Sequence, residues 1–173
     1  MEQLPKKIRL EDLKSFLKEC LKKEGVSEEN ARIIAEVLAE TDAYGTHSHG
    51  TVNLINYIKK AKVGGLDIRA NPIIVKEGPA FAIMDGQNGM GMVSGYKGMD
   101  LACKKAKEFG VGLVTVRNST HFGAAGYYAN MAALQGMFGI SMSNVDPNMT
   151  VPGAKGMLIG NNPIAYAAPA HKL

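Results

Sequence analysis

Two of the chain's four histidines, His47 and His49, stand two residues apart with Ser48 between them. Histidine gains or loses a proton near neutral pH more readily than other side chains, and it is also a common metal ligand. The stretch that contains them, DAYGTHSHGTVN at 42–53, offers little apolar side chain for a core. The spacing therefore leaves three interpretations open: a metal site, an acid–base site or an exposed surface turn.

The metal interpretation joins His47 and His49 to His121 as a three-histidine site of the kind that holds catalytic zinc. A His-x-His pair on a β-strand points both imidazoles the same way, but a turn does not impose that geometry. Asp42 is the one acidic residue at a typical ligand spacing. We therefore assign no metal ligand from the sequence.

The acid–base interpretation depends on a predicted helix that starts at Ser48. If Ser48 is the N-cap, His49 occupies the first helical position, where backbone N–H groups and the helix dipole attract anions. The same field disfavours a charged ring, so a neutral His49 is expected in the absence of a bound carboxylate. A histidine that changes charge beside an anion site suits a general acid or base.

Further polar loops follow other apolar segments of the chain. His121 lies in RNSTHFGAAGYY at 117–128, and the stretches SNVDPNMTVPGAKG and GNNP follow at 143–156 and 160–163. Loops at strand ends commonly carry binding and catalytic residues. We therefore expect these loops to converge on one cleft, with the rings of His49 and His121 sharing it.

Hydrophobic periodicity predicts the elements that must position these loops. Helices are expected at 10–24, 27–45, 48–64, 92–109 and 124–136, and strands at 73–77, 80–86, 111–118, 137–144 and 162–170. Residues 1–70 should form an N-terminal helical region, and residues 71–173 a mixed sheet covered by helices, which is an α/β fold. The apolar stripes of the helices place Phe16, Ile55 and Phe109 in the core.

Composition narrows the function classes. The 173 residues carry 20 basic and 16 acidic side chains, a net charge of +4, and the lysines are spread over helix faces, so no nucleic-acid partner is expected. No apolar run approaches the roughly 20 residues that span a bilayer, and no signal peptide is apparent. Cys20 and Cys103 fall on apolar helix faces, as free thiols do in a cytoplasmic protein.

The glycine-rich stretch GQNGMGMVSGYKG is close to a dinucleotide-binding fingerprint but does not match it. Gly89, Gly91 and Gly95 miss the G-x-G-x-x-G spacing by one position. A turn followed by a helix that packs closely is therefore favoured over a Rossmann cofactor site.

Four stretches together resemble the malate/L-lactate dehydrogenase family, which also contains ureidoglycolate, sulfolactate and diketogulonate dehydrogenases. They are HSHGTVNLINY, VRNSTHFGAAGYYA, SNVDPNMTVPGA and IGNNPIAYAAPA, in the family's order and spacing. The resemblance implies a reversible oxidation of small 2-hydroxy acids with NAD or NADP, a non-Rossmann dehydrogenase fold and a homodimer. It also implies a longer chain, so we expect these residues to be the front part of a larger, apparently truncated protein.

The resemblance also implies roles for individual residues. Ser48 and His49 match a serine–histidine pair whose histidine moves a proton, and His121 matches a histidine given the acid/base role in ureidoglycolate dehydrogenases. Tyr57 is expected to line the substrate site. Asn144, Val145 and Asn162 are expected to contact the cofactor.

Two departures from the family pattern concern the substrate. Asn53 replaces the usual arginine, a bidentate carboxylate clamp whose loss weakens carboxylate binding unless another cation replaces it. Arg117 is the candidate replacement. His47 stands where the family commonly has aspartate, as in ureidoglycolate-type members. A non-catalytic module that binds a ligand without turnover is the rival prediction from another class.

Overall fold

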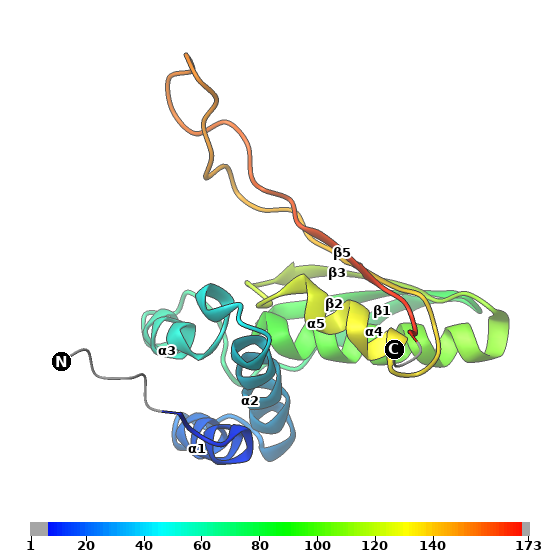
Figure 1. Cartoon of the computed structure of the whole chain (residues 1–173), viewed down its shortest axis with the longest axis horizontal. Helices are drawn as coiled ribbons and strands as arrows, with labels where there is room; N and C mark the ends of the chain where they lie inside the picture. Colours follow the sequence, from blue (N-terminus) through cyan, green and yellow to red (C-terminus); the bar gives the residue numbers. More distant parts are fainter. Residues whose placement is uncertain (1–6, 171–173) are drawn as a thin grey trace. The chain divides into compact units, whose positions relative to one another are not determined.

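The computed structural model describes residues 7–170, which form two compact units that meet between Ala124 and Ala125. Figure 1 traces the backbone of both units. The predicted α/β class with a mixed sheet is confirmed. The predicted division into a helical region at 1–70 and the front part of a cofactor and substrate domain at 71–173 stays a prediction.

The first unit begins with two packed helices, α1 (Leu10–Lys23) and α2 (Glu28–Ala43). Ser27 caps α2 as predicted, because its hydroxyl oxygen accepts the backbone N–H of Asn30 at 3.3 Å. The apolar faces of both helices supply fully buried side chains, among them Leu21, Ile33, Ile34, Val37 and Leu38. The prediction that Phe16 lies inward is wrong, since 63% of it is exposed.

The predicted helix start at Ser48 is also wrong. Two short 3-10 turns, η1 (His47–His49) and η2 (Thr51–Asn53), precede α3 (Leu54–Lys62). The carboxylate of Asp42 accepts two hydrogen bonds from Thr51, one from its backbone N–H at 3.0 Å and one from its hydroxyl at 2.5 Å. The backbone N–H of Thr51 is therefore bonded to a side chain and not to a carbonyl of a preceding helical turn. His49 therefore lies in a separate turn, and the proposed helix dipole does not act on it from that position. Ile55, expected inside, is 59% exposed.

The mixed sheet of the first unit has the order β1-β2-β3. Strand β1 (Ile73–Glu77) pairs antiparallel with β2 (Phe81–Gly89), and β2 pairs parallel with β3 (Leu113–Ser119). Helix α4 (Gly91–Phe109) connects the two parallel strands and packs on the sheet face that contains Val114 and Val116. Phe109, expected inside, is 46% exposed at the end of α4.

The second unit contains α5 (Ala125–Ala133) and a two-stranded antiparallel ribbon of β4 (Gly139–Met142) and β5 (Ile164–Ala167). The expected strands at 137–144 and 162–170 are therefore present but shorter, and they form a sheet of their own. An extended arm, residues 143–163, joins β4 to β5 and is drawn in orange in Figure 1. One isolated bridge, between Met149 and Ile159, links its two sides.

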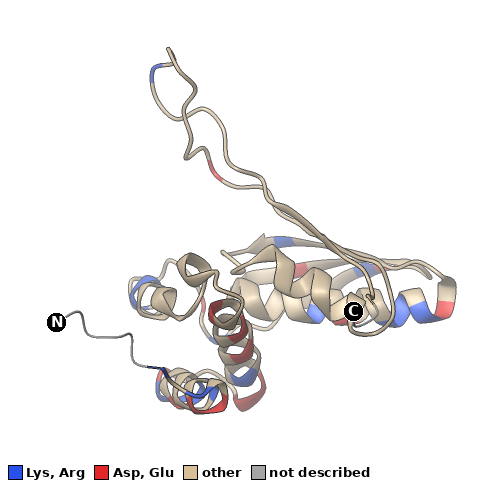
Figure 2. Cartoon of the chain, in the orientation of Figure 1, with Lys and Arg blue, Asp and Glu red and all other residues tan. Residues whose placement is uncertain are grey.

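Charged side chains are distributed unevenly over these elements. Figure 2 shows both signs interspersed on α1 and α2, whereas the arm carries one acidic and one basic residue. Within residues 7–170 no helix has the length and apolar character required to cross a bilayer.

Candidate active site

Ser48 and His49 are held together in the η1 turn. The Ser48 hydroxyl lies 2.9 Å from His49 Nδ1. The side-chain amide of Asn53 donates to the carbonyl of Ser48 at 2.8 Å, which ties the middle of η1 to the end of η2. Gly50 passes so close to the Asp42 carboxylate that a Cβ on this residue would overlap it. The two turns are thus fixed by side chains that belong to the same local motif.

His121 reaches the same place from a distant part of the sequence. It lies two residues beyond β3, and its Nδ1 is 2.7 Å from the hydroxyl of Tyr57 on α3. The ring centroids of His121 and His49 are 5.5 Å apart, and those of His121 and Tyr57 are 6.0 Å apart. The structure therefore brings together Ser48, His49, Tyr57 and His121, all within the first unit.

The protonation of this cluster follows from its surroundings. Burial raises the pKa of Tyr57 to about 12, so its hydroxyl keeps its proton at neutral pH. Part of His121 remains open to solvent, but desolvation by its neighbours lowers its pKa, and the nearby His49 and Lys60 lower it further. Both effects disfavour imidazolium, so a neutral His121 is expected near pH 7.

The tautomer of His121 follows from its partners. The backbone N–H of Gly123, at 3.4 Å from His121 Nδ1, can only donate. Nδ1 is therefore assigned as an acceptor, and the proton of the neutral ring lies on Nε2. His121 can accordingly donate a hydrogen bond from Nε2 to an oxygen atom of a ligand.

The glycine-rich stretch at the start of α4 does not offer a binding site for a nucleotide phosphate. A phosphate-binding loop needs free backbone N–H groups at the start of its helix. Here the N–H of Gly91 donates to the Thr120 hydroxyl at 3.3 Å, and a Cβ on Gly91 would overlap the carbonyl oxygen of Thr120. The start of α4 is covered by the loop that carries His121, so a Rossmann-type phosphate site does not fit it.

Other predicted site residues lie elsewhere or are already bonded. Arg117 donates through Nε to Asp85 at 3.0 Å and is not among the partners of His49 or His121. Asn144, Val145 and Asn162 belong to the second unit. There the side-chain oxygen of Asn162 accepts the backbone N–H of Val145 at 3.0 Å, which closes the base of the arm.

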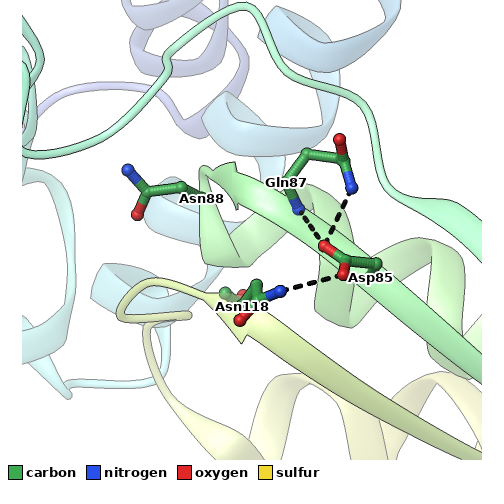
Figure 3. Close-up of a pocket in the computed structure, with 5 residues that line it drawn as sticks. Asp85, Gln87, Asn88 and Asn118 are labelled. Carbon is green, nitrogen blue, oxygen red and sulfur yellow. Dashed lines mark hydrogen bonds between the residues drawn. The ribbon is translucent and has the colours of Figure 1, made fainter.

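Two features were missed in the sequence. Asp85 in the middle of β2 is 6% exposed and accepts hydrogen bonds from residues of β3, although an acid that follows the apolar run AFAIM was a usable signal. Beside it lies a hollow of about 470 Å³, shown in Figure 3 and lined by Asp85, Gln87, Asn88, Asn118 and Ser119. Lys60 on α3 was also missed: its charge lowers the pKa of His121. No feature of the sequence around Lys60 distinguishes it from the neighbouring lysines.

No group of three or more His, Cys, Asp or Glu side chains in the described range 7–170 is arranged to hold a metal ion. The histidine cluster combines two imidazoles, a protonated tyrosine and a serine hydroxyl, which are all groups that can hold or pass on a proton.

The sequence of the chain matches a known protein family. The family model described as malate/L-lactate dehydrogenase matches residues 8–173. The chain belongs to this family.

Individual relatives agree with this assignment. The chain is 46% identical over 155 residues to a malate dehydrogenase of Pyrococcus horikoshii, which covers 90% of this chain and 43% of that protein. It is 44% identical over 165 residues to an L-sulfolactate dehydrogenase of Methanocaldococcus jannaschii, covering 95% and 48%.

A solved structure of the malate dehydrogenase from Pyrococcus horikoshii superimposes with a TM-score of 0.91 at 43% identity. The match covers 97% of this chain and 48% of that one. This chain thus spans about half the length of the relatives it matches.

Proposed function

We propose that the protein transfers hydride reversibly between NAD or NADP and a small 2-hydroxy acid. The observation that carries the proposal is the approach of two imidazoles, 5.5 Å apart, in a chain of this dehydrogenase family. The relatives compared above are named for malate and L-sulfolactate, both 2-hydroxy acids. A cytoplasmic homodimer is part of the same proposal.

His49 is proposed as the group that takes the hydroxyl proton in the oxidative direction. If its Nδ1–H donates to the Ser48 hydroxyl, 2.9 Å away, its Nε2 is left unprotonated and able to accept a proton. His121, with its proton on Nε2, would then donate a hydrogen bond to the same substrate oxygen. Tyr57 would hold the ring of His121 at 2.7 Å.

The cofactor would supply the hydride acceptor, and the protein would position it and the substrate. Asn144, Val145 and Asn162 are the proposed contacts, because a Rossmann phosphate site does not fit at the start of α4 and the family motifs point to the arm. NAD and NADP remain alternatives.

The substrate carboxylate is the least defined part of the proposal. Asn53, at the place of the family's usual arginine, uses its amide within the η turns. Arg117 keeps its proposed role only if its terminal guanidinium nitrogens, which bond no residue in the described part of the chain, reach the substrate. A ureidoglycolate-type acid is therefore an alternative to malate or lactate.

The test is turnover by the native gene product. Oxidation of NADH and NADPH should be followed with a panel containing oxaloacetate, pyruvate, sulfopyruvate and the keto acid of ureidoglycolate. We expect turnover with at least one of these acids. No turnover with either cofactor on any of them would overturn the proposal, and cofactor binding without turnover would favour the non-catalytic module.

The matched variants are His49→Ala, His121→Ala and His47→Ala. Loss of an acid–base group should lower kcat by about 10²- to 10⁴-fold at either of the first two positions. His47 lies in the same turn, but its side chain is 76% exposed, so its removal should leave kcat within about twofold. Equal losses at all three positions would contradict the assigned roles.

A further inference from the structure

Asp85 is the centre of a polar network at the carboxyl ends of β2 and β3. It is 6% exposed, and its carboxylate accepts four hydrogen bonds. One oxygen accepts the backbone N–H and the side-chain amide of Gln87, both at 2.9 Å. The other accepts the Asn118 amide at 2.9 Å and Arg117 Nε at 3.0 Å. Figure 3 shows the bonds to Gln87 and Asn118 converging on this one carboxylate.

The network joins the last parts of β2 and β3, where both strands have unusual backbone angles. Gln87 and Asn88 have φ of 54° and Asn118 has φ of 49°, a left-handed conformation that residues other than glycine adopt only with support from their surroundings. Asp85 bonds two of these three residues directly. A carboxylate that accepts from both strand segments fixes each of them relative to the other.

The end of β3 leads directly to His121, two residues further on. Between Asn118 and His121, the Thr120 hydroxyl donates to the carbonyl of Gly89 at 2.8 Å, which ties this part of the chain a second time to the end of β2. His121 is thus separated by only two residues from a backbone conformation that Asp85 supports. The mechanism proposed above does not use Asp85.

We propose that Asp85 is a positioning residue: by holding Asn118 and Arg117 it sets the direction in which the chain leaves β3, and so places the His121 ring against Tyr57. The kinetic consequence rests on the proposed function, whereas the position of the ring does not.

The test follows the His121 ring itself by nitrogen-15 NMR of histidine-labelled protein, with His121→Gln used to assign the signal. In Asp85→Asn, one acceptor becomes a donor that faces the donors of Asn118 and Arg117. We expect the His121 signal to lose its Nε2–H tautomer signature and its pKa to rise toward the ordinary value as the ring leaves its desolvated position.

Three further variants separate positioning from a general loss of structure. Gln87→Ala removes a partner on the β2 side only, and should leave the His121 signal unchanged. Asn118→Gly keeps a left-handed backbone accessible, whereas Asn118→Ala does not, so the alanine variant should shift the signal more. The double variant Asp85→Asn with Asn118→Asp exchanges donor and acceptor between positions 85 and 118 and should restore part of the signal, since only the bond from Arg117 stays lost.

The kinetic arm uses the reaction of the native gene product. Displacement of a catalytic group by about 1 Å can cost up to about a hundredfold in rate, so Asp85→Asn should lower kcat at least about tenfold with little change in KM, and the exchanged pair should recover part of it. Absence of turnover in every form would overturn the proposed function and leave the NMR result to decide the position of the ring.

An unshifted His121 signal in a folded Asp85→Asn protein would overturn the proposal. If that variant does not fold, the Asn118 pair decides, and identical unshifted signals in Asn118→Ala and Asn118→Gly would have the same consequence.

Discussion

The two units of the chain differ in how many of their large apolar side chains are buried. In the first, α1, α2, α4 and the sheet bury large apolar side chains, and the site residues are bonded to one another. In the second, within residues 125–170, the buried apolar side chains all lie on α5, while the ribbon and its arm leave large apolar groups exposed. The first unit therefore contains a site whose side chains are held by contacts with one another. The ribbon of the second unit is held mainly by backbone hydrogen bonds.

The strongest test of this difference is a matched pair of isoleucine truncations. Ile34 is fully buried on α2, and Ile164 on β5 is 64% exposed. Ile34→Ala should lower the free energy of unfolding by about 2–5 kcal/mol, because it removes buried methylenes and leaves a cavity. Ile164→Ala should change it by less than about 0.5 kcal/mol.

Urea denaturation followed by circular dichroism measures both values. A loss above about 1 kcal/mol for Ile164→Ala would mean that another surface covers the ribbon, since an exposed side chain has little transfer free energy to lose. The comparison of the two units would then have to be redrawn.

A pair of glycines tests the same difference at the level of backbone approach. A Cβ on Gly91 would overlap the loop that carries His121, whereas a Cβ on Gly126 in α5 meets nothing within 4 Å. Gly91→Ala should cost about 1–3 kcal/mol through overpacking. Gly126→Ala should be neutral or stabilising by up to about 1 kcal/mol, because alanine is the better helix former.

Thermal unfolding of the two variants gives this comparison. Similar unfolding temperatures for both would show that the loop that carries His121 can move away from α4 with little loss of stability. In that case the covering of Gly91 would no longer argue against a phosphate site there.

Much of this architecture could be predicted because it depends on local patterns. Apolar periodicity and the Ser27 cap predicted α1 and α2 to within a few residues, and β1 was predicted with the bounds it has in the structure. The motif resemblance directed attention to His49 and His121. These features are encoded by neighbouring residues or by short motifs.

The failures came from contacts between distant residues. The helix start at Ser48 was wrong because Asp42, nine residues before Thr51, captures its N–H, and periodicity carries no information about that bond. Asp85 was missed because two of its four hydrogen bonds come from Arg117 and Asn118 on β3, more than thirty residues away. The arm was predicted as a polar loop, but its extended form depends on pairing that propensity does not report.

Two tyrosines extend the comparison to single hydrogen bonds. Tyr57 is 8% exposed and its hydroxyl is 2.7 Å from His121 Nδ1, whereas Tyr166 on β5 is 73% exposed. Tyr57→Phe should cost about 0.5–1.5 kcal/mol, because a buried hydrogen bond is lost. Tyr166→Phe should leave the free energy of unfolding unchanged within about 0.5 kcal/mol. Denaturation in urea measures the two differences, and equal effects would show that the Tyr57 hydroxyl contributes no net stability.

The smallest expected effect is the contribution of His121, in the first unit, to the pH dependence of the free energy of unfolding. Burial, His49 and Lys60 hold the pKa of His121 below the ordinary value of 6.5, so below about pH 6.5 the unfolded chain binds a proton more readily than the folded chain. The contribution of His121 therefore lowers the free energy of unfolding as the pH falls through that window, and it vanishes above it. His121→Gln should flatten this decline. Urea titrations at a series of pH values between about 5 and 8 measure the slopes of the parent protein and the variant. An equally steep decline after His121→Gln would show that the ring is as well solvated in the folded chain as in the unfolded one, and the packed cluster around it would then not be the state in solution.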